Sequence, residues 1–313
     1  MIVIYDVIIL GGGPAGLSAA IYAGRARRSV LLIEKGAFGG QIIQSSGIEN
    51  YPGSIERESG ESLTGRMSAQ AETFGAERVT DTVTGVLPEG KIKTLTGAKG
   101  KYEGRALIVA TGAAPTRIGC PGESELTGRG VSYCATCDAA FFEGLPVYVV
   151  GGGDSAVEEA VYLAKFARNV TVIHRRDALR AAKYIQDAAF AEPKLSFIWN
   201  SAVTELHGDG LLESMTLKNV KTGEMTVIEA DKADGTFGLF VFVGMSPMSE
   251  LFDGLLDTEN GYILTDEGMA TNIPGVFAAG DVRKKLLRQV VTAAADGAIA
   301  AARAEKYLAD LHC

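Results

Sequence analysis

The sequence predicts an α/β fold that contains two β–α–β units. The first observation behind this prediction is length, because a chain of 313 residues is longer than a single hydrophobic core usually supports. The second is an internal repeat, in which the segment beginning at Gly11 is similar to the segment beginning at Gly151. The third is that a short apolar strand precedes each copy. We therefore expect two α/β domains.

The composition is that of a globular protein, with 47% hydrophobic and 22% charged residues. The net charge of -8 provides no basic face to neutralise phosphates, so we expect no nucleic-acid partner. The apolar N-terminus lacks the basic region of a signal sequence and runs directly into the glycines at Gly11, which favours a buried first strand. No uninterrupted apolar stretch is long enough to span a membrane, so we expect a cytoplasmic protein without membrane association.

The two copies of the repeat share one glycine pattern in the same register. In a nucleotide-binding unit the first glycine permits a tight turn, the second lets the backbone approach a pyrophosphate, and the third position must be small. The N-terminus of the following helix then faces the anion. Coincidental glycine turns are the alternative, but two copies in register favour two dinucleotide-binding (Rossmann-like) domains. The aligned pairs are Gly11 and Gly151, Gly13 and Gly153, and Gly16 and Ala156.

Apolar strands flank the alanine-rich helix of each copy. We expect strands over Asp6–Leu10 and Val30–Ile33 in the first copy, and over Val147–Val150 and Val170–Ile173 in the second. Each copy is therefore a complete β–α–β unit rather than an isolated glycine loop.

The copies differ at the position that reads the ribose. Glu34 ends the second strand of the first copy, where a carboxylate can accept hydrogen bonds from the ribose of FAD. The aligned residue of the second copy is His174, followed by Arg175, Arg176 and Arg180. Clustered guanidinium groups bind a 2′-phosphate, which a carboxylate would repel. The second copy is therefore expected to prefer NADPH to NADH, with a solvated basic helix start as the alternative.

Two further segments are expected to belong with the first copy. Residues 106–115 predict a strand that opens into a turn at Thr111 and Gly112. Residues 271–282 predict a strand that ends at Asp281, just before an alanine-rich helix, where a carboxylate can bond the ribityl or phosphate chain of a flavin. The sequence alone equally allows each segment to be a simple strand end.

These positions imply that the first domain is discontinuous. We expect residues 1–112 and 245–313 to form the FAD-binding domain and residues 113–244 to form an inserted NADPH-binding domain. The chain would then cross between the domains near residues 113–116 and 244–247.

Cys134 and Cys137 form a CxxC pair, which is suited to a small disulfide ring. A thiol near a helix N-terminus can also have a lowered pKa and hence more thiolate. Half a zinc site and purely structural cysteines are the alternatives, but Cys120 and Cys313 are isolated and the histidines form no ligand set. Because the pair lies shortly before Gly151, we expect a redox-active disulfide in the inserted domain.

Several motifs occur in a characteristic order: GGGPAG, CATCD, GGGDSA, HRRDALRA, and GVFAAGDV followed by RQV. Over almost the whole chain this order resembles the low-molecular-weight thioredoxin reductases of bacteria, in the pyridine nucleotide-disulfide oxidoreductase family. The resemblance implies that the chain transfers reducing equivalents from NADPH through FAD and the cysteine pair to thioredoxin, as a homodimer. Three residues depart from the family pattern, namely Ala139 after CATCD and Met245 and Met248 at the second crossing.

The resemblance also implies roles for individual residues. Cys137 would face the flavin, Cys134 would attack the disulfide of thioredoxin, and Asp138 would be the acid/base. No metal site is expected. The residues implied for FAD are Gly11, Gly13, Gly16, Glu34, Lys35, Gly40, Gln41, Asn50, Thr111, Gly112, Gly280, Asp281, Arg288, Gln289 and Val290. Those implied for NADPH are Gly151, Gly153, Asp154, Ser155, Ala156, His174, Arg175, Arg176 and Arg180.

Three other functions stay open at this level. A related flavin disulfide reductase would serve another thioredoxin-like partner. A second alternative takes its electrons from ferredoxin, although the intact second fingerprint and its arginines argue against this. The third is a nonredox NADP-binding sensor, which would be purified without the colour of a flavin.

Overall fold

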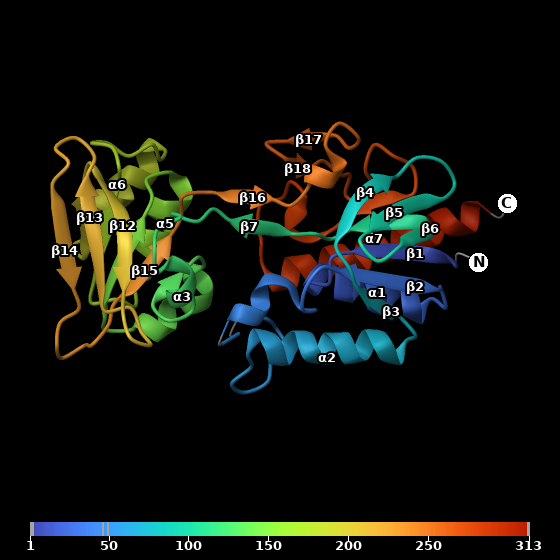
Figure 1. Cartoon of the computed structure of the whole chain (residues 1–313), viewed down its shortest axis with the longest axis horizontal. Helices are drawn as coiled ribbons and strands as arrows, with labels where there is room; N and C mark the ends of the chain where they lie inside the picture. The colour runs from blue at the N-terminus through green and yellow to red at the C-terminus, as the bar shows by residue number, and fades with distance from the viewer. Residues whose placement is uncertain (1–2, 46, 49, 312–313) are drawn as a thin grey trace. The chain divides into compact units, whose positions relative to one another are not determined.

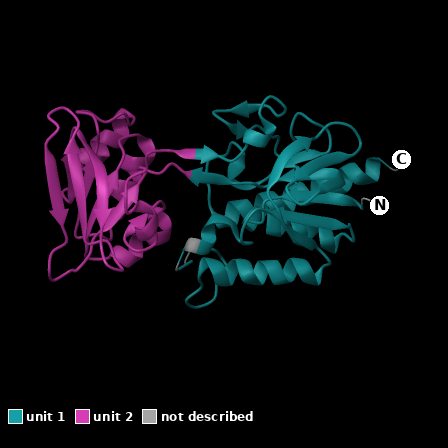
Figure 2. Ribbon diagram, viewed as in Figure 1, with its two compact units in different colours: residues 1–114, 246–313 teal, residues 115–245 magenta. Residues whose placement is uncertain are grey.

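The computed structural model describes residues 3–45, 47–48 and 50–311, and the chain divides into two compact units (Figures 1 and 2). Unit 1 draws on residues 1–114 and 246–313, and unit 2 on residues 115–245. The strands β7 (Ala113–Pro115) and β16 (Met245–Pro247) contain the two points where the chain passes between the units, and they pair with each other. Unit 2 is therefore an insertion into unit 1.

The sheet of unit 1 has the order β3-β2-β1-β6-β5-β4, with β19 also paired to β6. Its pairs are parallel apart from the β4–β5 and β5–β6 pairs, which are antiparallel. Residues 7–10 of β1 are all buried, as expected where helices or loops cover both faces of a parallel sheet. The strands are β1 (Ile4–Leu10), β2 (Val30–Glu34), β3 (Glu77–Thr80), β4 (Val83–Leu87), β5 (Lys93–Gly97), β6 (Lys101–Val109) and β19 (Val276–Ala278), with a small hairpin of β17 (Thr258–Glu259) and β18 (Tyr262–Ile263).

The helices of unit 1 pack through small residues. A Cβ on Gly297 of α7 would lie 2.0 Å from the carbonyl oxygen of Ala15 on α1, so only glycine permits this approach of the two helices. The Ser18 hydroxyl donates to the carbonyl of Ala294 across the same contact, at 2.7 Å. The helices are α1 (Pro14–Arg25), α2 (Gly60–Thr73) and α7 (Val290–Asp310), with 3₁₀ turns η1 (Gly40–Gln44), η3 (Glu250–Phe252) and η4 (Gly280–Val282) (Figure 1).

Two glycines of unit 1 are expected to respond oppositely to alanine. A Cβ on Gly16 would lie 1.8 Å from the carbonyl oxygen of Gly11, so we expect Gly16→Ala to lower the free energy of unfolding by about 3 kcal/mol. The matched control is Gly65→Ala on the exposed face of α2, where a Cβ meets no atom within 4 Å among the described residues. It should raise the free energy of unfolding by about 1 kcal/mol. Urea unfolding measures both changes, and equal values would contradict the steric argument.

Unit 2 contains a five-stranded parallel sheet of order β11-β10-β9-β15-β8 and a three-stranded antiparallel sheet of order β12-β13-β14. The strands are β8 (Val131–Ser132), β9 (Pro146–Val150), β10 (Asn169–Ile173), β11 (Leu195–Ile198), β12 (Ser201–His207), β13 (Ser214–Asn219), β14 (Met225–Glu229) and β15 (Gly238–Val241). The helices are α3 (Glu123–Leu126), α4 (Ala135–Asp138), α5 (Asp154–Leu163) and α6 (Lys183–Ala191), with the 3₁₀ turn η2 (Ala139–Phe142) after α4.

The four strands predicted to flank the repeats are present, and the α/β prediction is confirmed. The structure differs from the alternative of a basic helix start after His174 and from one expected helix start. The basic segment after His174 is not helical, because the N–H of Arg180 donates to the carbonyl of Gly152 at 2.7 Å and α6 begins only at Lys183. Likewise α7 begins at Val290 rather than next to Asp281. Among the described helices, none has the length and apolarity needed to cross a bilayer.

Candidate active site

The first glycine turn lies between β1 and α1 and is held by Glu34. The Glu34 carboxylate accepts hydrogen bonds from the backbone N–H of Gly12 at 2.7 Å and of Lys35 at 2.8 Å. A Cβ on Gly40 would lie 2.9 Å from the Cα of Gly13, so the first residue of η1 approaches the turn as closely as glycine allows. Gly13 is the position of the sequence motif at which the backbone is expected to approach a pyrophosphate.

Residues from distant segments of unit 1 meet near the end of β6. Gln41 donates through Nε2 to the carbonyl of Ala113 at 2.8 Å. The Thr111 hydroxyl donates to the carbonyl of Met248 at 2.5 Å, and Gly112 takes a positive φ of 78°. The structure thus joins Gln41 and the Thr111 turn to the segments at which the chain leaves and re-enters unit 1.

Asp281 and Arg288 each hold a buried polar atom that needs a partner. Asp281 Oδ1 and Arg288 Nε have no hydrogen-bond partner within the described part of the chain. Burial raises the pKa of Asp281, while the charge of Lys285 opposes that rise. Hydroxyl and phosphate oxygens of a ribityl chain are groups that such donors and acceptors bind, so these residues fit FAD.

A buried ion cluster supports this segment. The Asp296 carboxylate on α7 accepts hydrogen bonds from Lys285 Nζ at 2.8 Å, Arg283 Nη1 at 3.1 Å and the N–H of Gly280 at 3.1 Å. The carboxylate therefore ties Gly280, Arg283 and Lys285 to α7. The sequence motifs did not predict a role for Asp296, because this residue lies within α7, beyond the RQV motif.

The N-terminus of α7 lies beside another predicted residue. Asn50 donates through Nδ2 to Oε1 of Gln289 at 3.2 Å. Gln289 is the N-cap of α7 and forms a capping box with Thr292, and Val290 is the first residue of the helix. These contacts bring the predicted FAD residues at Asn50, Gln289 and Val290 together.

The second glycine turn, between β9 and α5, is backed by a histidine in place of the glutamate. A Cβ on Gly152 would lie 2.4 Å from Nδ1 of His174, so the imidazole packs directly against the turn. Burial lowers the pKa of His174, and the charges of Arg180, Arg176 and Arg175 lower it further. His174 Nε2 is buried and has no hydrogen-bond partner among the residues described.

The three arginines after His174 are exposed. The ion pairs of unit 2 are made by other basic residues. A cluster of positive charge next to a nucleotide turn fits the 2′-phosphate of NADPH. At the start of α5, Asp154 accepts a hydrogen bond from the N–H of Ala182 at 2.7 Å, Ser155 is exposed and Ala156 is buried.

Cys134 and Cys137 form a disulfide with a Cα–Cα distance of 5.3 Å. Cys134 occupies the N-cap position of the short helix α4, and Asp138 is its last residue. Burial raises the pKa of Asp138, and a hydrogen bond from Ser132 opposes the rise. No group of three possible ligands is placed to hold a metal ion in residues 3–45, 47–48 and 50–311. This arrangement suits disulfide exchange.

The other described cysteine is of a different kind. Burial, followed by the charge of Glu123, raises the pKa of Cys120 to about 11. A thiol with such a pKa holds almost no thiolate at neutral pH, so Cys120 is a poor nucleophile. The terminal Cys313 lies outside the described residues.

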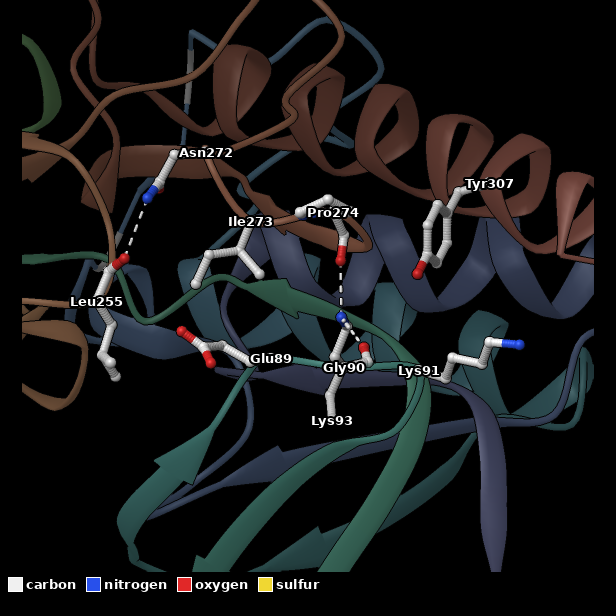
Figure 3. Close-up of a pocket in the computed structure, with 9 residues that line it drawn as sticks. All are labelled: Glu89, Gly90, Lys91, Lys93, Leu255, Asn272, Ile273, Pro274 and Tyr307. Atoms are coloured by element: carbon white, nitrogen blue, oxygen red, sulfur yellow. Dashed lines mark hydrogen bonds between the residues drawn. The ribbon is translucent and has the colours of Figure 1, made fainter.

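An open cavity of about 570 Å³ lies elsewhere in unit 1 (Figure 3). Lys93 is buried beside it and donates through Nζ to the carbonyls of Gly90 and Pro274, both at 2.7 Å. Burial lowers the pKa of Lys93. The residues that line the cavity include none of those predicted to bind FAD or NADPH or to carry the redox chemistry.

The chain is similar in sequence and structure to known proteins. The family model for pyridine nucleotide-disulphide oxidoreductases matches residues 5–297. A thioredoxin reductase of Peptoclostridium acidaminophilum is 58% identical over 306 residues, which cover 97% of each chain. The crystal structure of thioredoxin reductase from Streptococcus pyogenes MGAS5005 superposes with a TM-score of 0.90 at 46% identity, covering 98% of this chain and 99% of that one.

A solved structure of a ferredoxin-flavin thioredoxin reductase from Clostridium acetobutylicum is also similar, with a TM-score of 0.52 and 30% identity over 98% of each chain. Both thioredoxin reductases described above share more of their sequence with this chain. The chain therefore belongs to the pyridine nucleotide-disulphide oxidoreductase family, within the thioredoxin reductases, which are NADPH-dependent flavoproteins.

Proposed function

We propose that this chain reduces oxidised thioredoxin in the cytoplasm, as a homodimer, with NADPH as the source of electrons. The observation that carries the proposal is the Cys134–Cys137 disulfide in the same unit as a glycine turn flanked by exposed arginines. The unsatisfied polar atoms at Asp281 and Arg288 support a bound FAD in unit 1. The alternative is a related reductase that serves another thioredoxin-like partner or takes electrons from ferredoxin.

The binding roles follow the two units. Residues 1–112 and 245–313 would bind FAD through the glycine turn, Glu34 and the segment from Gly280 to Val290. Residues 113–244 would bind NADPH, with the arginines after His174 on its 2′-phosphate. When bound, FAD accepts a hydride from NADPH and supplies two electrons to the disulfide.

The cysteines then carry out two exchange steps. The Cys134 thiolate attacks one sulfur of the thioredoxin disulfide, which forms a mixed disulfide and releases the other sulfur as a thiolate. Asp138 gives its proton to the departing thiolate. Cys137, as a thiolate, attacks the Cys134 sulfur, which restores the internal disulfide and releases reduced thioredoxin.

One purification and two assays test the proposed function. We expect a yellow protein whose flavin spectrum is bleached by NADPH, and NADPH oxidation that depends on added thioredoxin. Bleaching by NADPH without transfer to thioredoxin would indicate another partner. Bleaching by reduced ferredoxin but not by NADPH would overturn the electron source and leave the disulfide chemistry intact.

A further inference from the structure

Ser132 makes hydrogen bonds to the backbone of Cys134 and to the carboxylate of Asp138. It is the second residue of β8, only 5% exposed, and its backbone pairs with Phe240 of β15. The Ser132 hydroxyl donates to Oδ2 of Asp138 at 2.6 Å. The same oxygen accepts the N–H of Cys134 at 3.1 Å, and it lies 3.3 Å from the Cys134 carbonyl.

Two of these three contacts need the hydroxyl proton of Ser132, and that proton can serve only one of them at a time. A serine hydroxyl has one donor and two acceptor positions. When Asp138 is a carboxylate, the proton of Ser132 points to Oδ2, and the oxygen accepts from the N–H of Cys134. When Asp138 is protonated, the acid can donate to the Ser132 oxygen, and the serine proton turns to the carbonyl of Cys134.

We propose that Ser132 is a positioning residue whose hydroxyl stays hydrogen-bonded in both protonation states of Asp138, so that this carboxyl can release and regain a proton without an unpaired polar group. The proposal rests on the role of Asp138 as proton donor stated above. Two-electron reduction breaks the Cys134–Cys137 bond and yields two thiolates. Asp138 later gives its proton to the thiolate that leaves when Cys134 attacks the thioredoxin disulfide, and this leaves a carboxylate, to which Ser132 then donates.

Ser132 is the side chain whose hydrogen bond affects the pKa of Asp138. Burial and the Ser132 hydrogen bond are the two causes of its pKa shift. The packed helix α5 carries the acidic groups Asp154, Glu158 and Glu159, and none of them contributes to that shift among the residues described. Burial of Ser132 also keeps water from taking over its hydrogen bonds.

The expected effect of Ser132→Ala has a definite sign. Both forms of Asp138 lose a hydrogen bond, but the charge-assisted bond to the carboxylate is roughly twice as strong as the neutral one. The carboxylate is therefore destabilised more, and the pKa of Asp138 should rise by about one pH unit. The acid also loses its acceptor, so the C=O stretch of protonated Asp138 should move to higher frequency.

Difference infrared spectroscopy of the oxidised holoenzyme with isotope-labelled aspartate measures both quantities. Ser132→Thr keeps the hydroxyl and should titrate like the wild type. Ser196→Ala is the matched control, because it removes a hydrogen bond to Thr171 of 2.9 Å in the same unit but away from Asp138. Ser132→Gly provides a second variant without the hydroxyl if Ser132→Ala does not fold.

The proposal would be overturned if the titration midpoint of Asp138 and the position of its C=O band were unchanged in Ser132→Ala and Ser132→Gly. The infrared titration of the oxidised holoenzyme does not require the enzyme to turn over. If Asp138→Asn retains full activity, the proton-donor role fails, while the titration of Asp138 still decides what Ser132 does.

Discussion

Replacing Cys137 with serine is expected to lower kcat/KM for thioredoxin by at least about a thousandfold, while NADPH still bleaches the flavin. A serine hydroxyl forms no disulfide with Cys134, so the electrons have no route out of the flavin to a protein substrate. Anaerobic titration with NADPH measures reduction of the flavin, and a coupled assay separately measures electron transfer to thioredoxin. The variant retains the N-cap position of Cys134 and the hydrogen bond between Ser132 and Asp138, since neither involves the Cys137 sulfur.

The matched control for this prediction is Cys120→Ser. Cys120 lies in the same unit, but its raised pKa keeps it a thiol, and we expect turnover within about twofold of the wild type. Full turnover in Cys137→Ser would mean that another sulfur accepts electrons from the flavin. A large loss in Cys120→Ser would show that the loss in Cys137→Ser is not specific to the disulfide.

The second large effect concerns the choice of coenzyme. A charge-assisted hydrogen bond contributes about 1.5–3 kcal/mol, so replacing Arg175 and Arg176 together with alanine, which removes one such bond from each, should lower kcat/KM for NADPH by about a hundredfold to ten-thousandfold. The value for NADH should not change, because NADH has no 2′-phosphate. Steady-state kinetics with both coenzymes measure the ratio. The fluorescence of Trp199, the single tryptophan of the chain, gives the affinity independently, since its ring lies 6.4 Å from that of His174.

Arg168→Ala is the control for the coenzyme prediction. Arg168 is an exposed arginine of the same unit, but its guanidinium is paired with Asp234. The Arg168→Ala substitution removes one positive charge and should leave the preference for NADPH over NADH unchanged. If the double variant kept the wild-type ratio of NADPH to NADH, the arginines after His174 would be ordinary surface charges.

The sequence predicted the parts of the fold that depend on local geometry. The turns at Gly11 and Gly151 require positive φ angles and close backbone approach, and only small residues meet those demands. The repeat therefore predicted both glycine turns, and the aligned positions at the ends of the second strands identified Glu34 and His174. The order of the motifs along the chain also implied that one α/β unit is inserted into the other, which the structure bears out.

Contacts that depend on tertiary folding could not be predicted in the same way. The segment after His174 is not helical, and the carbonyl of Gly152 accepts the N–H of Arg180, a contact that helical propensity does not reveal. Asp296 is another example. From sequence, a carboxylate inside an alanine-rich helix is expected to be exposed, and only the folded structure shows its ion pairs with Lys285 and Arg283. Ser132 has a partner six residues away, but only the turn of α4 brings the two side chains together.

The tight contact between α1 and α7 also has a consequence for synthesis on the ribosome. α1 is synthesised before the inserted unit and α7 after it, and the Ala15–Gly297 approach holds the two helices together. The inserted unit emerges complete while its host still lacks β19 and α7, so it can fold first as the chain elongates. The host sheet and its covering helices then close only after the C-terminal segment leaves the exit tunnel. Truncation before α7 should therefore leave a nascent chain with a folded insert and an unfinished host.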